Sequence, residues 1–280
     1  MSHPREPVGE WWGDQVVALH RWGRLVLRDE DDSVHQMRVT VRRLRSVLAT
    51  YRPLLDAERS EPLRAELKWL GALLGEVRDA EVLRKRLTRW AAQHGPGPTG
   101  VDALRAALAE RQAQGRARLL PELDSDRYRA LIAALADGVP WSEADPGKKA
   151  LRKRLRRSWR RLAAAADAAA QTDEEEERRR RLHEVRKKAK RVRYAAESLG
   201  AIFGKDTERL GKAAKSIQST LGDLNDAAVM ISTIGLVPAP DDAIRELLEA
   251  EEAAAEDAEE RFASVWKKVN RSKVHGWLSP

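Results

Sequence analysis

The sequence predicts an all-α protein in which two helical bundles, produced by an internal duplication, are related by a pseudo-twofold axis. Three observations support this prediction. Of 280 residues only 17 are Gly and 12 are Pro, Ala, Leu, Arg and Glu predominate, and alternating runs of Val, Ile and Thr are missing, which is typical of helices rather than strands. Apolar residues recur at the helical period of about 3.6 residues. Two motifs also occur twice at nearly the same offset.

The repeated motifs define the duplicated unit. They pair VHQMRVTVRRLR (34–45) with LHEVRKKAKRVR (182–193), at an offset of 148, and LLGEVRDAEVL (73–83) with TLGDLNDAAVM (220–230), at an offset of 147. Two matches at nearly one offset indicate a repeat of about 140 residues. We therefore expect a first bundle in residues 1–140 and a second in residues 141–280. By analogy with isologous dimers, their equivalent faces should meet or flank a shared basic groove or pore.

The helical period and the positions of Pro, Gly and Asp place the individual helices. In the first bundle we expect helices at 10–28, 34–51, 58–74, 76–93, 101–120 and 126–137. In the second we expect them at 147–170, 174–202, 206–219, 223–233 and 241–269. The breaks fall at DEDDS (29–33), GPGPTG (95–100), DGVP (137–140), DPG (145–147) and VPAP (237–240). There Pro and Gly stop a helix, and Asp or Ser can cap the next one.

Composition excludes several classes of protein. With no Cys, the chain can form neither a disulfide framework nor a thiolate metal site. The first residues, MSHPREPVGEWW, do not form a secretory signal, and nowhere do about 18 uncharged apolar residues run together. We therefore expect a cytoplasmic protein with no membrane partner.

Charge is distributed unevenly along the chain, whose formal net charge is +8. Residues 148–161 contain nine basic residues and no acid, and residues 178–193 contain ten basic residues and one acid, Glu184. Residues 241–260 contain ten acids and one Arg. This separation indicates a basic surface for a polyanion. The segment 148–161, taken alone, is more typical of a solvated helix face than of a binding site.

The helix at 34–51 carries two parallel stripes. The stripe expected to face the core comprises Val34, Met37, Val41, Leu44, Leu48 and Tyr51. The same spacing begins again one residue later, about 100° around the helix, and gives His35, Arg38, Arg42 and Arg45. In the second unit the apolar stripe is Leu182, Val185, Ala189 and Val192, beside His183, Arg186, Lys190 and Arg193. Like charges at this spacing repel one another, so the doubled stripe indicates an external anion.

The residue types favour a phosphate chain without bases. Arg presents a planar fork to phosphate oxygens, Lys acts as a point charge, and phosphate favours the protonated form of His. Sites for single-stranded nucleic acid normally place aromatic rings among the basic residues. Here only Tyr194 falls on a basic stripe, and its counterpart is Ser46.

These segments resemble the CHAD domain, the conserved histidine α-helical domain. The resemblance covers about residues 10–235 and includes DSDRYRALIAAL (124–135); it is carried by a doubled His-x-x-Arg-x-x-x-[Arg/Lys] followed by Leu-Gly-x-x-x-Asp. It implies two pseudo-symmetric bundles that bind inorganic polyphosphate in a basic groove or pore between them, without catalysis. It also raises polyphosphate granules as a location. The Glu-x-Glu-x-Lys signature of the metalloenzyme domain to which many CHAD domains are fused does not occur, so we expect a stand-alone binder with no cofactor or metal.

Carried over residue by residue, the resemblance implies ligand contacts in both units. They are His35, Arg38, Arg42, Arg43 and Arg45 in the first unit and His183, Arg186, Lys190, Arg191 and Arg193 in the second. Additional contacts are expected from the helix that opens the second unit, namely Lys153, Arg156, Arg157 and Arg160. Asp79 and Asp226 should each pair with an Arg to hold the bundle. Because Lys187 and Lys188 stand where the first unit has Val39 and Thr40, the two halves should contribute unequally.

Two other functions stay open at this point. One is binding of RNA or another nucleic acid. The other, less favoured, is processing of polyphosphate by an enzyme, which would need acids near the basic face to hold Mg²⁺, and Glu184 is the only acid within either stripe. The acidic helix at 241–269 could cover the bundle or compete for the basic surface, and its apolar residues, among them Ile244 and Phe262, favour packing.

Overall fold

The computed structural model describes residues 4–94, 99–142, 146–237 and 240–279. The helices are α1 (Arg5–Leu27), α2 (Ser33–Tyr51), α3 (Ala57–His94), α4 (Thr99–Leu123), α5 (Asp126–Ala136), α6 (Lys148–Ala170), α7 (Glu175–Ser198), α8 (Gly200–Phe203), α9 (Lys205–Ile234), α10 (Asp242–Val269) and α11 (Ser272–His275), with 3₁₀ helices η1 (Arg52–Leu54) and η2 (Gly276–Leu278). The described residues contain no β-strand, only an isolated bridge between Leu55 and Trp141. The all-α prediction is confirmed.

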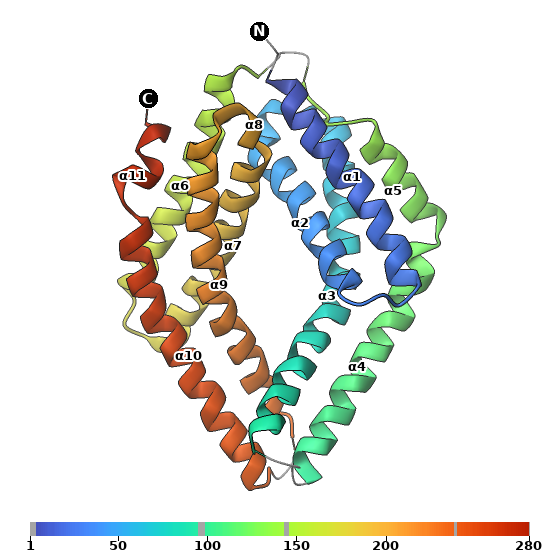
Figure 1. The fold of residues 1–280 in the computed structure, drawn as a ribbon, viewed down its shortest axis with the longest axis vertical. Coiled ribbons are helices and arrows are strands. Elements are labelled where there is room, and N and C mark those ends of the chain that lie inside the picture. The colour runs from blue at the N-terminus through green and yellow to red at the C-terminus, as the bar shows by residue number, and fades with distance from the viewer. Residues whose placement is uncertain (1–3, 95–98, 143–145, 238–239, 280) are drawn as a thin grey trace.

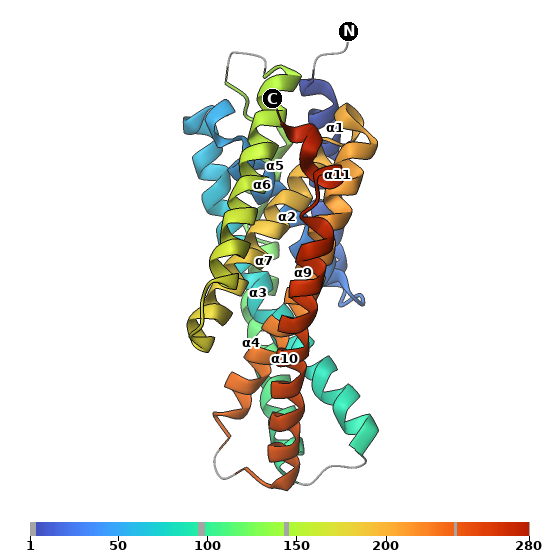
Figure 2. The same cartoon turned by 90° about the vertical axis from the view of Figure 1, so that its left-hand side faces the viewer.

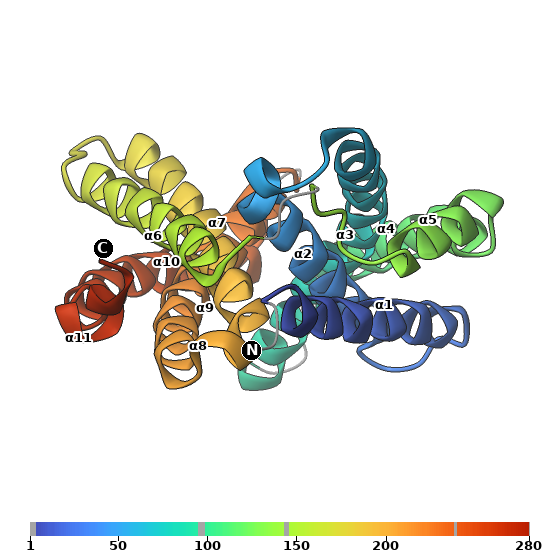
Figure 3. The same ribbon diagram turned by 90° about the horizontal axis from the view of Figure 1, so that it is seen from above.

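The helices form two groups that lie side by side, α1–α5 and α6–α11 (Figures 1 and 3). Near the end that holds both termini, α2 packs against α7. At the opposite end α3 contacts α9 and α4 contacts α10. The molecule is elongated when it is viewed from the side (Figure 2). The two groups therefore touch at both ends, with α2, α3, α7 and α9 facing one another in between.

The core forms where the helical period predicts it. The side chains of the apolar stripe on α2, from Val34 to Tyr51, are at most 2% exposed. The corresponding stripe on α7, from Leu182 to Val192, is buried too. Both stripes belong to one continuous cluster, while a smaller cluster joins α3 and α4 to α9 and α10 at the far end. The expected boundary near residue 140 falls between α5 and α6 but stays a prediction, because the main core runs through both groups.

Two predicted helix breaks are wrong, since α3 and α9 are each continuous. The gaps expected between residues 74 and 76 and between residues 219 and 223 contain Gly75 and Gly222, which lie inside these helices. A Cβ at Gly75 would lie 3.4 Å from the Arg38 guanidinium, and one at Gly222 would lie 3.7 Å from that of Arg186. These glycines therefore permit a close approach between helices instead of ending one. Parts of the breaks expected at 95–100, 145–147 and 237–240 lie outside the described residues, namely 95–98, 145 and 238–239.

The acidic helix packs along α9. Its apolar side, which includes Ile244, Leu247 and Phe262, is buried, as the sequence favoured. The chain then continues into α11 and η2, which the sequence analysis did not predict. No helix among the described residues combines the length and the apolar character needed to span a membrane.

Candidate functional site

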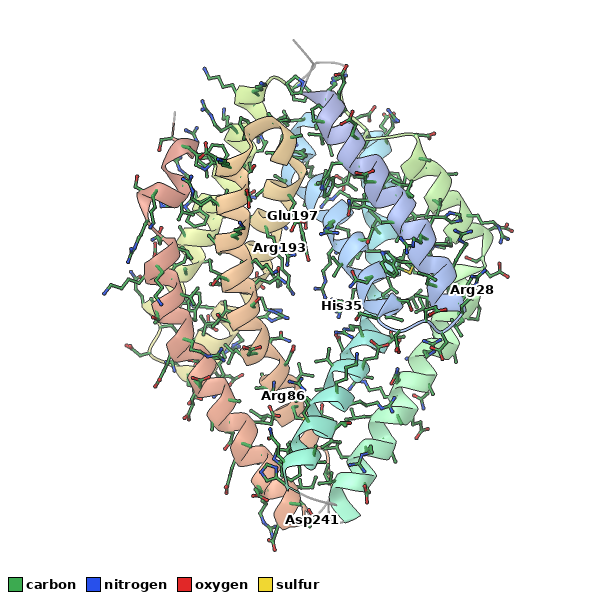
Figure 4. All side chains as sticks on the ribbon, viewed as in Figure 1. Arg28, His35, Arg86, Arg193, Glu197 and Asp241 are labelled. Carbon is green, nitrogen blue, oxygen red and sulfur yellow. The ribbon has the colours of Figure 1, made fainter. Side chains whose placement is uncertain are left out.

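A hollow of about 920 Å³ lies between the two groups of helices, with walls from α2, α3, α7 and α9. The charged and imidazole side chains that line it are His35, Arg38, Arg42, Arg45, Glu61, Arg64, Lys68, Arg78, Asp79, His183, Arg186, Lys187, Lys190, Arg191 and Asp226. Among the described residues, ten Lys or Arg line this central hollow against three Asp or Glu. His35 and His183 reach the same space from opposite sides, and Figure 4 marks His35 on the inner side of its bundle.

The rotation of α2 and α7 about their axes brings the basic stripes into the central hollow. Each helix buries its apolar stripe in the core, and a stripe displaced by one residue points about 100° away from it. Because α2 and α7 lie against each other at one end, side chains that point in this direction face the space between the two groups. Eight of the ten site residues predicted on these two helices line the hollow, four from each helix.

Two arginines of the stripes are held by acids from the neighbouring helix. Arg38 donates from Nη1 to Oδ1 of Asp79 at 2.8 Å, and Nη2 of Arg186 lies 3.9 Å from Oδ1 of Asp226. Asp79 follows Gly75 by one helical turn, which explains the motif Leu-Gly-x-x-x-Asp. The glycine leaves room for the guanidinium and the aspartate accepts its hydrogen bond. The expected pairing of Asp79 and Asp226 with arginines is confirmed.

Other cations in the central hollow have no such partner. Arg42, Arg45, Lys190 and Arg191 form no ion pair with any residue that the structure describes. Burial, together with the positive charges of Arg186 and Arg42, lowers the pKa of Lys190 to about 6. Burial and the charge of Arg38 lower the pKa of Arg42 to about 10. The positive charges gathered in the central hollow make protonation of each further basic group less favourable, and a bound anion would offset this cost.

The two histidines have different neighbours. Nδ1 of His183 donates a hydrogen bond to Oδ1 of Asn225 at 2.9 Å. The equivalent residue in the first unit is Arg78. Burial lowers the pKa of His35, and the positive charge of Arg78 lowers it further. Burial also lowers the pKa of His183, although the hydrogen bond to Asn225 opposes this change. The surroundings of the two histidines therefore differ, through Arg78 on one side and Asn225 on the other; unequal contributions to ligand binding stay a prediction.

Arg43 and Arg193 do not line the central hollow, contrary to the expectation for ligand contacts. Both bind Glu197, with Nε of Arg43 at 3.0 Å from Oε2 and Nε of Arg193 at 2.8 Å from Oε1. Arg193 also donates to Gln218. Figure 4 shows Arg193 and Glu197 together on α7. The Arg43–Glu197 pair therefore joins α2 to α7, while the Arg193–Glu197 pair lies within α7 and holds Glu197 in place.

Most of the residues of α6 that were expected to contact the ligand lie away from the hollows. Lys153, Arg156 and Arg160 line neither the central hollow nor the smaller hollow beside it, whereas Arg157 lines the smaller one. The buried line of Leu151, Leu155 and Leu162 fixes the rotation of α6. That rotation turns a different set of side chains toward α2.

Sequence reasoning missed the contribution of α3. Arg64, Lys68 and Arg78 line the central hollow. Each follows a buried apolar residue by one position, as after Leu63 and Leu67. The rule that identified the basic stripes of α2 and α7, one position after each buried apolar residue, would have identified these residues as well.

Comparisons with known proteins agree with this architecture. The family model described as "CHAD domain" matches residues 12–235. PptA from Streptomyces chartreusis has a similar fold, with a TM-score of 0.75 and 20% sequence identity over 95% of this chain and 100% of that chain. The CHAD domain from the plant Ricinus communis gives a TM-score of 0.67 and 23% identity over 99% of this chain and 92% of that one.

Two curated proteins of Mycobacterium tuberculosis are also similar, both named as uncharacterized: MT2285 of strain CDC 1551 / Oshkosh and Rv2226 of strain ATCC 25618 / H37Rv. Each is 32% identical over 238 residues, which cover 81% of this chain and 44% of the relative. The aligned region thus spans less than half the length of these relatives. The family model matches most of this chain, and the chain shares its fold with a CHAD domain of known structure. The chain therefore belongs to the CHAD domain family.

Proposed function

We propose that the protein binds inorganic polyphosphate in the central hollow and leaves it chemically unchanged. The observation that carries this proposal is the excess of ten Lys or Arg over three Asp or Glu among the described residues of one hollow. Phosphate oxygens accept the charge-assisted hydrogen bonds that Arg and Lys donate. A polyphosphate chain carries such oxygens along its whole length. The resemblance of the protein's sequence to CHAD domains points to the same ligand.

The second candidate ligand, RNA, receives less support from the lining. Binding of single strands usually depends on aromatic rings on which bases stack. Tyr194 is the only Phe, Trp or Tyr among the described lining residues, and it is 1% exposed. A polymer that offers phosphates without bases therefore matches this surface better.

The ion pairs formed by the acidic residues of the central hollow support binding without turnover. Glu61 pairs with Arg52 and Arg64, while Asp79 and Asp226 pair with the arginines of the stripes. A carboxylate held by arginine is a poor ligand for Mg²⁺, which polyphosphate-cleaving chemistry would require. We expect no release of orthophosphate when the protein is incubated with polyphosphate and Mg²⁺; sustained release would favour the enzyme hypothesis.

Charge reversal inside the hollow tests the site. Replacing Arg42 and Lys190 together (R42E/K190E) should abolish polyphosphate binding in calorimetric titration while far-UV circular dichroism shows unchanged helicity. The control R24E/R28E changes the formal charge by the same amount at two exposed positions, Arg24 of α1 and Arg28 at its C-terminal cap, which Figure 4 marks on the outer side. It should retain most of the affinity. Retained binding by R42E/K190E would exclude the central hollow as the site.

Competition separates the two polyanions. Both ligands should bind less tightly as salt increases, because each displaces counterions. Polyphosphate should displace bound RNA at a much lower phosphate concentration than the reverse, and the opposite order would make RNA the ligand. We further propose a cytoplasmic location at polyphosphate granules, which a fluorescent fusion in polyphosphate-rich and polyphosphate-free cells would test.

A further inference from the structure

A second hollow adjoins the central one, between α6 and the C-terminal end of α2. Its volume is about 310 Å³, about ten times the share of one water molecule in the liquid. The charged residues that line it are Arg52, Arg64, Arg154, Arg157, Arg161 and Arg191. No Asp or Glu is among the described residues of this lining. A lining whose charged residues are all arginines is suited to an anion with several oxygens.

The two hollows are continuous in their lining. Arg64, Arg191 and Ala49 belong to both. Burial lowers the pKa of Arg191, and the positive charges of Arg161 and Arg64 lower it further. Positive charge therefore continues without interruption from the central hollow past Arg191 to α6.

Several polar groups of the second hollow have no partner. Arg154, Arg157, Arg161 and Arg191 form no ion pair within the described part of the chain. Nε of Arg154 is buried without a hydrogen-bond acceptor, and Oγ1 of Thr50, a residue that is 6% exposed, is buried without any partner. Leaving such a group unsatisfied costs about 1–3 kcal/mol. Four guanidinium groups of the lining thus remain available to pair with phosphate oxygens.

We propose that the second hollow is a distinct phosphate subsite, which holds the outgoing part of a polyphosphate chain already bound in the central hollow. This inference rests on the proposed function of the central hollow. A short chain would occupy the central hollow alone, whereas a long chain would pass Arg64 and Arg191 and engage the arginines of α6. Because the second contact is then intramolecular, it raises affinity for long chains selectively.

Two pairs of substitutions on α6 test the subsite. R157Q/R161Q removes two exposed arginines that line the second hollow, and K153Q/R160Q removes two exposed basic residues that line neither hollow. The pairs remove equal charge from the same helix, and none of these side chains is part of the core. Dissociation constants would be measured for tripolyphosphate and for long-chain polyphosphate at several salt concentrations.

We expect R157Q/R161Q to weaken long-chain binding about tenfold, equivalent to about 1.4 kcal/mol, and to leave tripolyphosphate binding unchanged. Its salt dependence should also become shallower, because two contacts that release counterions are lost. K153Q/R160Q should match the wild type for both ligands. Equal weakening by the two pairs, unchanged long-chain binding by R157Q/R161Q, or an equal loss for both ligands would each overturn the subsite.

Failure of the subsite can be told from failure of the proposed function. If R42E/K190E abolishes binding of both ligands while R157Q/R161Q binds like the wild type, only the subsite is refuted. If R42E/K190E binds both ligands as the wild type does, the central hollow is refuted, and the inference falls with it.

Discussion

Arg86 of α3 binds Glu251 of α10 with both carboxylate oxygens 2.6 Å from Nε, at the end of the molecule where the two groups of helices meet. Glu251 is 4% exposed. The pair joins the first group of helices to the acidic helix of the second group, so the acidic helix contributes a buried contact between the groups as well as a solvated face.

Replacing Arg86 by Met should destabilise the protein by about 3 kcal/mol, because the Glu251 carboxylate would stay buried without its partner. The double variant R86M/E251M should recover most of this loss. Urea unfolding measures both values. As a control, R105M breaks the exposed pair with Asp102 on α4 and should cost less than about 1 kcal/mol. A similar small loss for R86M would show that the buried pair contributes little.

Polyphosphate binding should weaken as pH rises above about 6. In the free protein the pKa of Lys190 is about 6, so this group is mostly neutral at pH 7. A bound polyanion raises that pKa, and binding must then take up a proton. The affinity loss can reach about tenfold per pH unit for one group. His35 and His183, whose pKa values are also lowered, should add to proton uptake near their own pKa values.

Calorimetry in buffers with different ionisation enthalpies measures this proton uptake directly. K190R should flatten the pH dependence above pH 7, because an arginine stays protonated. An unchanged profile in K190R would show that Lys190 is not the group that titrates.

K190M should stabilise the ligand-free protein while it weakens polyphosphate binding. The folded-state pKa of Lys190 lies below its unfolded value of 10.5, so the unfolded chain binds more protons between about pH 6 and 10.5. In this window Lys190 opposes folding, and stability rises with pH. We expect a gain of about 1–2 kcal/mol at pH 7, or a few degrees in Tm. K153M, on the exposed face of α6, should change stability by less than about 0.5 kcal/mol.

The D226N substitution should increase affinity for polyphosphate several-fold. Asp226 is one of three acids among the described residues of the central hollow, and its contact with Arg186 is long, at 3.9 Å. Asn keeps the shape and removes a negative charge that opposes the ligand, and stability should change by less than about 1 kcal/mol. Direct titration measures the change. A clear loss of affinity would instead mean that Asp226 orients Arg186 for binding.

Much of the site follows from helical geometry within single segments. The apolar stripe of a helix defines which face is buried, and the stripe one residue later lies at a fixed angle to it. This is why His35, Arg38, Arg42 and Arg45 could be predicted as one row. The same rule, applied to α3, would have added Arg64, Lys68 and Arg78.

Other residues required knowledge of the neighbouring helix. Arg43 and Arg191 are aligned in the repeat, yet Arg43 pairs with Glu197 while Arg191 lines both hollows. The gap expected between residues 74 and 76 contains Gly75, and glycine disfavours helices. In the folded chain it lies beside Arg38, and packing outweighs the propensity.

The all-α class, the stripes of α2 and α7 and the sign of their charge could be predicted, because they depend on residue type and on the period of one helix. The packing of the helices was needed to learn which basic side chains share a hollow, which are neutralised by an acid, and which face of α6 turns toward α2. Burial, ion pairing and pKa depend on groups that are distant in the chain, and their positions are set by how the helices pack against one another.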